Sequence, residues 1–140
     1  MQLSDFEQFP NLVAMFFDRA RARGDGPFLS AKHDGAWRAI TWREAADRVC
    51  LMAEALRGLG LKDGDRVALV SENRPEWCLA DLAIMAAGLV TVPTYITNTE
   101  RDHAHIIENS GAAAVIVSNA KLAKTLLPAA VRSVDAKIVI

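Results

Sequence analysis

Apolar residues in the first part of the chain follow the spacing of a helix and then of a hairpin. Residues 10–23 begin with a proline, which the first turn of a helix tolerates, and continue with apolar side chains at helical spacing. Two short apolar runs, Phe28–Ala31 and Trp37–Ile40, then flank a turn that contains Asp34 and Gly35. Because both turn residues accept positive φ, the pattern predicts a β-hairpin.

The segment after the hairpin has the signature of a capped amphipathic helix. Thr41 and Glu44 stand in the pattern in which each side chain satisfies a free backbone N–H group at the start of a helix. Apolar residues recur at helical spacing as far as Leu56, and Gly58 and Gly60 are expected to end the helix. We therefore expect this helix to connect the hairpin to the rest of the chain.

From residue 66 onward, short apolar runs recur at regular intervals. These runs are Arg66–Val70, Leu89–Val92, Ala114–Val117 and Lys137–Ile140. Helical patterns fill the gaps, and the alternation of apolar strands with helices indicates right-handed crossovers between parallel strands. The predicted fold class is α/β, a mostly parallel sheet with helices on both faces, preceded by an N-terminal helix and a β-hairpin.

Three helices are predicted in the gaps between the apolar runs. The first has Pro75 just inside its start, with Asn73 in place to cap it. The second begins at Asn98 or Thr99. The third carries apolar residues at helical spacing until Pro128, which is expected to break it because proline has no N–H to donate.

We expect residues 1–140 to be the N-terminal part of a single domain. Within it, residues 1–40 hold the helix and the hairpin, and residues 41–140 hold the α/β repeats. The last run, Lys137–Ile140, finishes the chain in mid-strand without a polar tail. This ending predicts a partial domain that is truncated at its C-terminus, with an exposed sheet edge through which chains can self-associate.

The composition is that of a soluble globular protein, with 51% hydrophobic and 24% charged residues. The formal net charge is −1, so no broad positive field exists for nucleic acid, and nucleic-acid binding is not expected. The N-terminus has no secretory signal, and the longest apolar stretch, Leu82–Pro93, is about half of the roughly 20 residues that cross a bilayer. We expect a cytoplasmic protein with no transmembrane segment.

The cysteines and two of the histidines give no sign of a metal site. Cys50 and Cys78 lack CxxC spacing and are interpreted as buried thiols in a reducing compartment. His103 and His105 stand two residues apart on a predicted helix, so their side chains point to different faces. We therefore predict no metal ligands in this chain.

No pattern for a catalytic residue is present. The sequence contains neither GxxxxGK[ST] nor GxSxG, and the glycines between residues 58 and 64 follow a helix, as capping and turn residues do. The carboxylates around the second strand, Asp63, Asp65, Glu72 and Glu76, are interpreted as solvated or as favourable to helix dipoles.

The turn Ser71–Trp77 is more informative, because it follows a predicted parallel strand at the end where α/β sheets place their ligands. Its alternative explanation is a capped helix start.

Five segments, in this order and spacing, resemble the N-terminal part of adenylate-forming enzymes, which include acyl-CoA synthetases. The segments are Ile40–Glu44, Gly58–Ala68, Asn73–Trp77, Met85–Pro93 and Ser110–Ser118. The first is similar to the family's hydrophobic-Thr-Tyr-x-Glu motif, with Trp42 in the place of the tyrosine. The sequences of residues 71–77 and 92–99 are most similar to those of bacterial long-chain fatty-acyl-CoA ligases.

The resemblance implies a ligase that activates a carboxylate with MgATP to acyl-AMP and then transfers the acyl group to CoA. Its implied partners are a fatty acid, ATP, Mg²⁺, CoA and the remainder of the synthetase chain, with any membrane contact made through the lipid substrate. The phosphate loop, the adenine and magnesium motifs and the catalytic lysine of such enzymes are not found in these residues, so the chain alone is expected to be inactive.

The resemblance also implies a surface that faces CoA. Tyr95 and Thr97 match by position a loop that lines the CoA nucleotide in some members, and Lys121 and Lys124 follow the next strand. Tyr95 can stack on a purine or pack against the sheet, and the lysines can neutralise phosphates or simply be solvated. Two alternatives stay open, a fatty-acyl-AMP ligase that loads a carrier protein and a stand-alone flavodoxin-like binding module.

Overall fold

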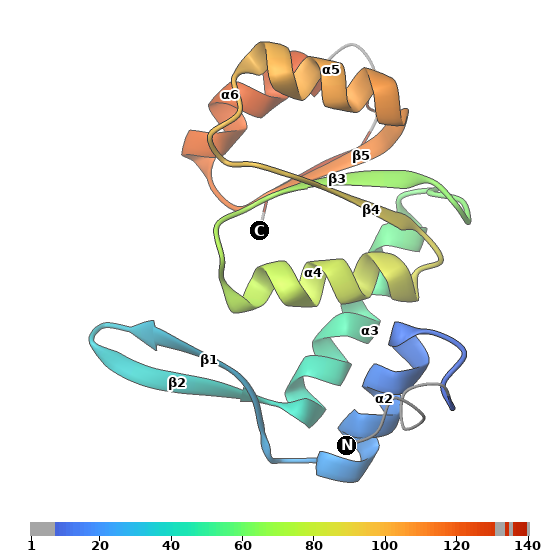
Figure 1. Cartoon of the computed structure of the whole chain (residues 1–140), viewed down its shortest axis with the longest axis vertical. Helices are drawn as coiled ribbons and strands as arrows, with labels where there is room; N and C mark the ends of the chain where they lie inside the picture. The colour runs from blue at the N-terminus through green and yellow to red at the C-terminus, as the bar shows by residue number, and fades with distance from the viewer. Residues whose placement is uncertain (1–7, 131–133, 135, 140) are drawn as a thin grey trace.

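The computed structural model describes residues 8–130, 134 and 136–139 as a layered α/β structure. Figure 1 shows α5 and α6 on one side of a sheet and α3 and α4 on the other, with α2 and a β-hairpin beyond α3. In chain order the elements are α2 (Leu12–Arg23), β1 (Pro27–His33), β2 (Ala36–Thr41), α3 (Trp42–Gly58), β3 (Arg66–Val70), α4 (Pro75–Ala86), β4 (Val90–Thr94), α5 (Glu100–Ser110), β5 (Ala112–Val117), α6 (Ala120–Ala130) and β6 (Ala136–Val139). The predicted fold class is confirmed.

The larger sheet has the strand order β4-β3-β5-β6, and each of its pairings is parallel. On β3, Ala68 pairs with Val92 of β4 on one side and with Val115 of β5 on the other. Because the strands run in the same direction, the turns that follow β3, β4 and β5 emerge at one edge of the sheet, which we call the carboxyl edge.

Alternate residues of the central strands serve two different cores. Val67 and Leu69 of β3 pack with the cluster that includes Leu56 of α3 and Ile84 of α4. Ala68 and Val70 pack instead with the cluster that includes Ile107 of α5 and Leu126 of α6. The continuous apolar runs of the sequence therefore arise because both faces of the sheet are covered.

A third core joins the N-terminal elements to the helical layer. The ring centroids of Phe28 and Trp42 lie 4.0 Å apart, and Phe16 of α2 lies 5.6 Å from Phe28 and 5.9 Å from Trp42. Leu79 and Leu82 of α4 belong to the same cluster. Aromatic packing thus connects α2 and the base of the hairpin to α4.

The local signals of the first part of the chain are confirmed. Asp34 has φ 51° and Gly35 has φ 81° in the tight turn between β1 and β2. Thr41 accepts a hydrogen bond from the Glu44 backbone, and the Glu44 side chain accepts one from the Thr41 backbone at 2.9 Å, which completes a capping box. Both features need only neighbouring residues, so sequence alone predicts them well.

The start of α2 differs in detail from its prediction. Asn11, and not the proline before it, occupies the cap, and its side chain accepts a hydrogen bond from the Ala14 backbone at 2.8 Å. The proline therefore precedes the helix, and the helix starts with Asn11 as its N-cap residue and not with a proline in its first turn.

Two further expectations are wrong. Pro128 lies inside α6 and does not break it. Leu126 and Ala130 on either side of it are fully buried, and this packing holds the last turn in spite of the missing N–H.

The expectation that both cysteines are buried is the second one. Cys50 is exposed, because Val49 faces the core and the next position on a helix points about 100° away. Cys78 is half-buried, and both cysteines are free.

Within the described part of the chain, no helix combines the length and the apolar character that a membrane span requires.

Replacement of a central side chain tests the position of β3. Leu69 is fully buried between the sheet and α4, so Leu69→Ala is expected to lower the free energy of unfolding by about 2–5 kcal/mol. Urea denaturation measures the change. Leu59→Ala, at a leucine that is 52% exposed beyond α3, is the matched control and should stay within about 0.5 kcal/mol. Equal losses in the two variants would contradict the central place of β3.

Candidate functional site

The turns after β3 and β5 are joined by the carboxylate of Glu72. The Ser118 hydroxyl donates to Glu72 Oε2 at 2.5 Å, and the Asn119 side-chain amide donates to Glu72 Oε1 at 2.8 Å. Asn119 Oδ1 in turn accepts from the Leu122 backbone N–H at 2.9 Å, at the start of α6. Glu72 therefore connects the carboxyl end of β3 to that of β5 and, through Asn119, to the first turn of α6. We call these three side chains the Glu72 bridge.

The hydrogen bonds of the bridge favour the ionised carboxylate. The contact with Ser118 is the first reason that the pKa of Glu72 lies below its ordinary value, and burial acts in the opposite direction. Arg74 also donates to the Ser118 carbonyl oxygen at 3.5 Å, so a cation stands beside the bridge. The interpretation of Glu72 as a merely solvated carboxylate is therefore wrong.

The other carboxylates near β3 fit their predicted role as surface groups. Asp63 lies 3.5 Å from Arg57 in an exposed ion pair, and Asp65 accepts from the Lys62 backbone at 2.8 Å. Exposed pairs of this kind contribute little to stability.

The start of α4 is organised by an ion pair and not by a side-chain cap. Arg74 is the cap residue and makes no capping hydrogen bond with its side chain, so the expectation that Asn73 caps the helix is wrong. Pro75 occupies the first turn as predicted. Arg74 Nε donates to Glu76 Oε2 at 2.7 Å, and this contact lowers the pKa of Glu76.

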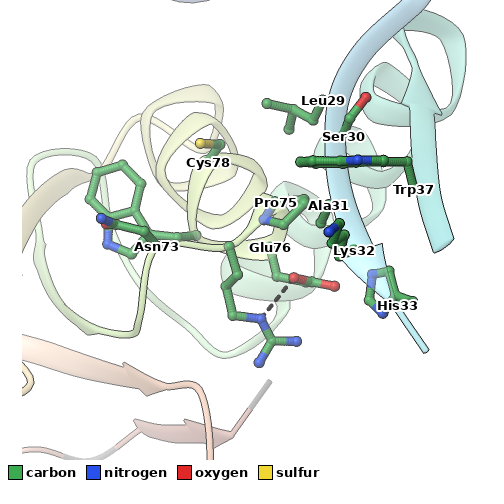
Figure 2. A pocket seen from close by; sticks show the side chains of 12 residues that line it. Leu29, Ser30, Ala31, Lys32, His33, Trp37, Asn73, Pro75, Glu76 and Cys78 are labelled. Atoms are coloured by element: carbon green, nitrogen blue, oxygen red, sulfur yellow. Dashed lines mark hydrogen bonds and ion pairs between the residues drawn. The ribbon is translucent and has the colours of Figure 1, made fainter. Parts of the chain in front are cut away.

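A cleft of about 740 Å³ separates the hairpin from the start of α4. Figure 2 shows residues of β1 and the indole of Trp37 across from Asn73 and from Pro75 and Glu76 at the start of α4. The Trp37 side chain is 70% exposed, and Lys32 Nζ lies 5.7 Å from the centroid of its ring. We call this space the hairpin cleft.

A second cleft of about 450 Å³ lies at the carboxyl edge between the turns after β3 and β4. Its lining residues are Ser71, Glu72, Asn73, Trp77, Pro93, Thr94, Tyr95 and Ile96. Asn73 and Trp77 also line the hairpin cleft, so the turn between β3 and α4 forms a wall of both spaces. We call the second space the edge cleft; it brings the predicted Ser71–Trp77 turn together with Tyr95.

The structure does not gather all the candidate CoA-facing residues in one place. Tyr95 lines the edge cleft with its side chain 79% exposed, so it does not pack against the sheet. Thr97 is exposed in the same loop but is not among the lining residues of either cleft. Lys121 and Lys124 lie exposed on α6, and within the described residues neither has a hydrogen bond or ion pair. Among the described residues they are therefore cations without a charged partner, and α6 begins at the carboxyl edge.

The two histidines of α5 point to different faces, as predicted. His103 is 1% exposed, whereas His105 is exposed. Across the described ranges, no group of three or more His, Cys, Asp or Glu side chains is placed to hold a metal ion.

The family of the chain follows from comparison with known proteins. A family model described as "AMP-binding enzyme" matches residues 16–140. The chain belongs to the AMP-binding enzyme family.

Relatives of this AMP-binding chain include long-chain-fatty-acid–CoA ligases. One from Mycobacterium tuberculosis is 38% identical over 73% of the chain, and one from Salmonella typhimurium is 33% identical over 79% of it. The aligned residues are only 17% and 19% of the length of those relatives, so the chain aligns with less than a fifth of each.

Solved structures share the same fold. A benzoate CoA ligase from Burkholderia xenovorans superposes with a TM-score of 0.80 and 25% identity, over 93% of this AMP-binding chain and 26% of the other. An anthranilate CoA ligase in complex with anthranoyl-AMP reaches 0.81 over the whole chain and 27% of its own, and its 20% identity makes it evidence for the fold alone.

Sequence reasoning missed the Glu72 bridge because its partners are far apart in the chain. Glu72 and Ser118 are the second and first residues after their strands. A signal was available: polar residues directly follow the apolar runs Arg66–Val70 and Ala114–Val117, and parallel strands bring such positions to one edge.

The Glu72 bridge predicts a specific acid sensitivity. Because the folded-state pKa of Glu72 lies below its ordinary value of 4.5, its stabilisation is present above that value and is lost as the pH falls through the folded-state pKa. Glu72→Gln is expected to lower the free energy of unfolding near neutral pH by about 1 kcal/mol. Urea denaturation over a series of pH values should show the difference from the native chain shrinking in acid.

Glu54→Gln is the control, since Glu54 is an exposed glutamate on α3. A difference between the native chain and Glu72→Gln that is constant with pH would show that the bridge does not depend on the charge of Glu72.

Proposed function

We propose that the chain is the N-terminal part of a fatty-acyl-CoA ligase. The whole enzyme activates a fatty acid with MgATP to acyl-AMP and then transfers the acyl group to CoA. Membership of the AMP-binding family and the long-chain-fatty-acid–CoA ligases among the relatives support this proposal. Because the chain aligns with less than a fifth of those relatives, the proposal concerns a protein of which these residues are one portion.

The structural observation that carries the CoA-binding part of the proposal is the exposed ring of Tyr95 at the carboxyl edge. A tyrosine ring that is 79% exposed and lines a cleft offers a free face for a purine. Thr97 adds an exposed hydroxyl in the same loop, and Lys121 and Lys124 supply exposed cations from α6. The Tyr95 ring in the edge cleft suits the adenine of CoA, and the hydroxyl and the two cations outside this cleft suit its phosphates.

CoA supplies the thiol that accepts the acyl group. In this proposal the residues of the chain bind and orient the nucleotide end of CoA and leave proton transfer and phosphate chemistry to other parts of the enzyme. The Glu72 bridge holds the carboxyl edge to which the Tyr95 loop is attached.

Kinetics of the whole enzyme test the role of Tyr95. Tyr95→Ala is expected to raise the KM for CoA about five- to a hundredfold, because stacking on a base contributes about 1–3 kcal/mol. Pyrophosphate exchange, which reports adenylate formation without CoA, should be unchanged. Tyr95→Phe keeps the ring and is the matched control, with a KM close to that of the native enzyme.

Several outcomes contradict the proposal. An unchanged KM for CoA in Tyr95→Ala would remove Tyr95 from the CoA site. Adenylate formation without any thioester in the native enzyme would favour a fatty-acyl-AMP ligase that loads a carrier protein. Pyrophosphate exchange by the isolated 140 residues would show that the reaction centre lies within them, and a flavin bound by those residues in calorimetry would favour the flavodoxin-like module.

A further inference from the structure

Three polar side chains form a cluster at the base of the loop between β4 and α5. Thr94 is the last residue of β4, and its hydroxyl oxygen lies 3.4 Å from Nδ1 of His103 in α5. The side-chain amide of Asn98 donates to the same oxygen at 2.7 Å. His103 is 1% exposed, and Thr94 and Asn98 are half-buried. We call this cluster the loop clamp.

The hydrogen bonds of the loop clamp fit a neutral histidine. The Asn98 amide nitrogen can only donate, so the Thr94 oxygen accepts that bond and its hydroxyl proton remains available. His103 Nδ1 is the nearby partner of that hydroxyl. In a neutral imidazole, Nδ1 accepts the hydroxyl proton when Nε2 carries the ring proton, and it donates to the second lone pair of the Thr94 oxygen when Nδ1 carries it. Burial favours the neutral state, because desolvation lowers the pKa of His103, while neighbouring Asp102 acts in the opposite direction.

The loop that the clamp closes has little packing of its own. The Asn98 backbone N–H donates to the Tyr95 carbonyl oxygen at 3.2 Å, so the loop is a tight turn. At its tip, Tyr95 is 79% exposed and Ile96 is 43% exposed. Since few side-chain contacts restrain this tip, the polar contacts at its base must determine where Tyr95 lies at the rim of the edge cleft.

We propose that His103 is a positioning residue, which acts through Thr94 to hold the Tyr95 loop in the conformation that lines the edge cleft. The role of the loop in CoA binding rests on the proposed function above, whereas the clamp itself rests on the geometry of the three side chains. His103 touches no substrate in this account. It determines the position of Tyr95, the residue that contacts CoA in the proposed function.

The competing explanation is that His103 only fills space in the core. Ile107, one turn further along α5, is buried on the same face, so an apolar side chain at position 103 would continue an apolar stripe. Such a side chain would leave the Thr94 hydroxyl without its hydrogen-bond partner on α5. The two explanations therefore differ in whether a hydrogen-bonding atom is required at the position of His103 Nδ1.

Substitutions at this atom separate the two explanations. His103→Leu removes the hydrogen-bond partner of Thr94 and introduces an apolar side chain, whereas His103→Asn places an amide group, which can accept or donate, near the position of Nδ1. Thr94→Val removes the hydroxyl from the other side while it preserves the shape. Tyr95 is the one tyrosine of the chain, so isotope-labelled tyrosine gives a single backbone amide signal, and its heteronuclear Overhauser ratio reports the mobility of the loop.

We expect the Overhauser ratio of the Tyr95 amide in the native chain to match that of an ordered strand. It should fall by about half or more in His103→Leu and Thr94→Val, as flexible backbone does, with an unchanged far-ultraviolet circular dichroism spectrum. His103→Asn should restore the native ratio. An unchanged ratio in His103→Leu, or a loss in His103→Asn as large as in His103→Leu, would overturn the proposal.

If His103→Leu does not fold, Thr94→Val tests whether the loop clamp holds the Tyr95 loop. A folded valine variant with a native ratio overturns the clamp, and a valine variant that does not fold shows that the contact supports the whole domain and overturns a local role. In the whole enzyme, His103→Leu should also raise the KM for CoA without changing pyrophosphate exchange. If the amide ratios follow the expectation while CoA kinetics do not respond, the CoA assignment fails and the loop clamp stands.

Discussion

Parallel hydrogen bonding of β3 to strands on both of its sides is the constraint on which the other features depend. It buries both faces of the strand, so α3 and α4 must cover one face and α5 and α6 the other. It also sends the turns after β3, β4 and β5 to a single edge of the sheet. Polar side chains that follow these strands are therefore brought close together at this edge. There they can form the hydrogen bonds that an apolar core does not offer.

Two polar clusters at this edge hold the turns in place by different means. The Glu72 bridge uses a carboxylate to connect the ends of β3 and β5, which are neighbours in the sheet but distant in sequence. The loop clamp uses a buried neutral histidine to close the turn after β4. Between them they border the edge cleft, where Tyr95 stands exposed at the end of a rigid sheet, as binding residues on a scaffold commonly do.

Sequence reasoning predicted those features whose causes lie within a few residues of each other or in a regular pattern. The capping pair Thr41 and Glu44 and the order of strands and helices are of this kind. Pro128 was misjudged because burial of its neighbours outweighs its missing hydrogen bond. The contact between Glu72 and Ser118 could not be predicted from either residue, since it requires the parallel order of β3 and β5 and the side-chain geometry at their ends.

The interstrand nuclear Overhauser contacts of β3 test the central claim most directly. The account predicts that Ala68 contacts both Val92 and Val115 in parallel register, with β3 between β4 and β5. An antiparallel register, or direct contact of β4 with β5, would contradict it. In that case the turns would no longer share an edge, and neither the Glu72 bridge nor the edge cleft could form as described.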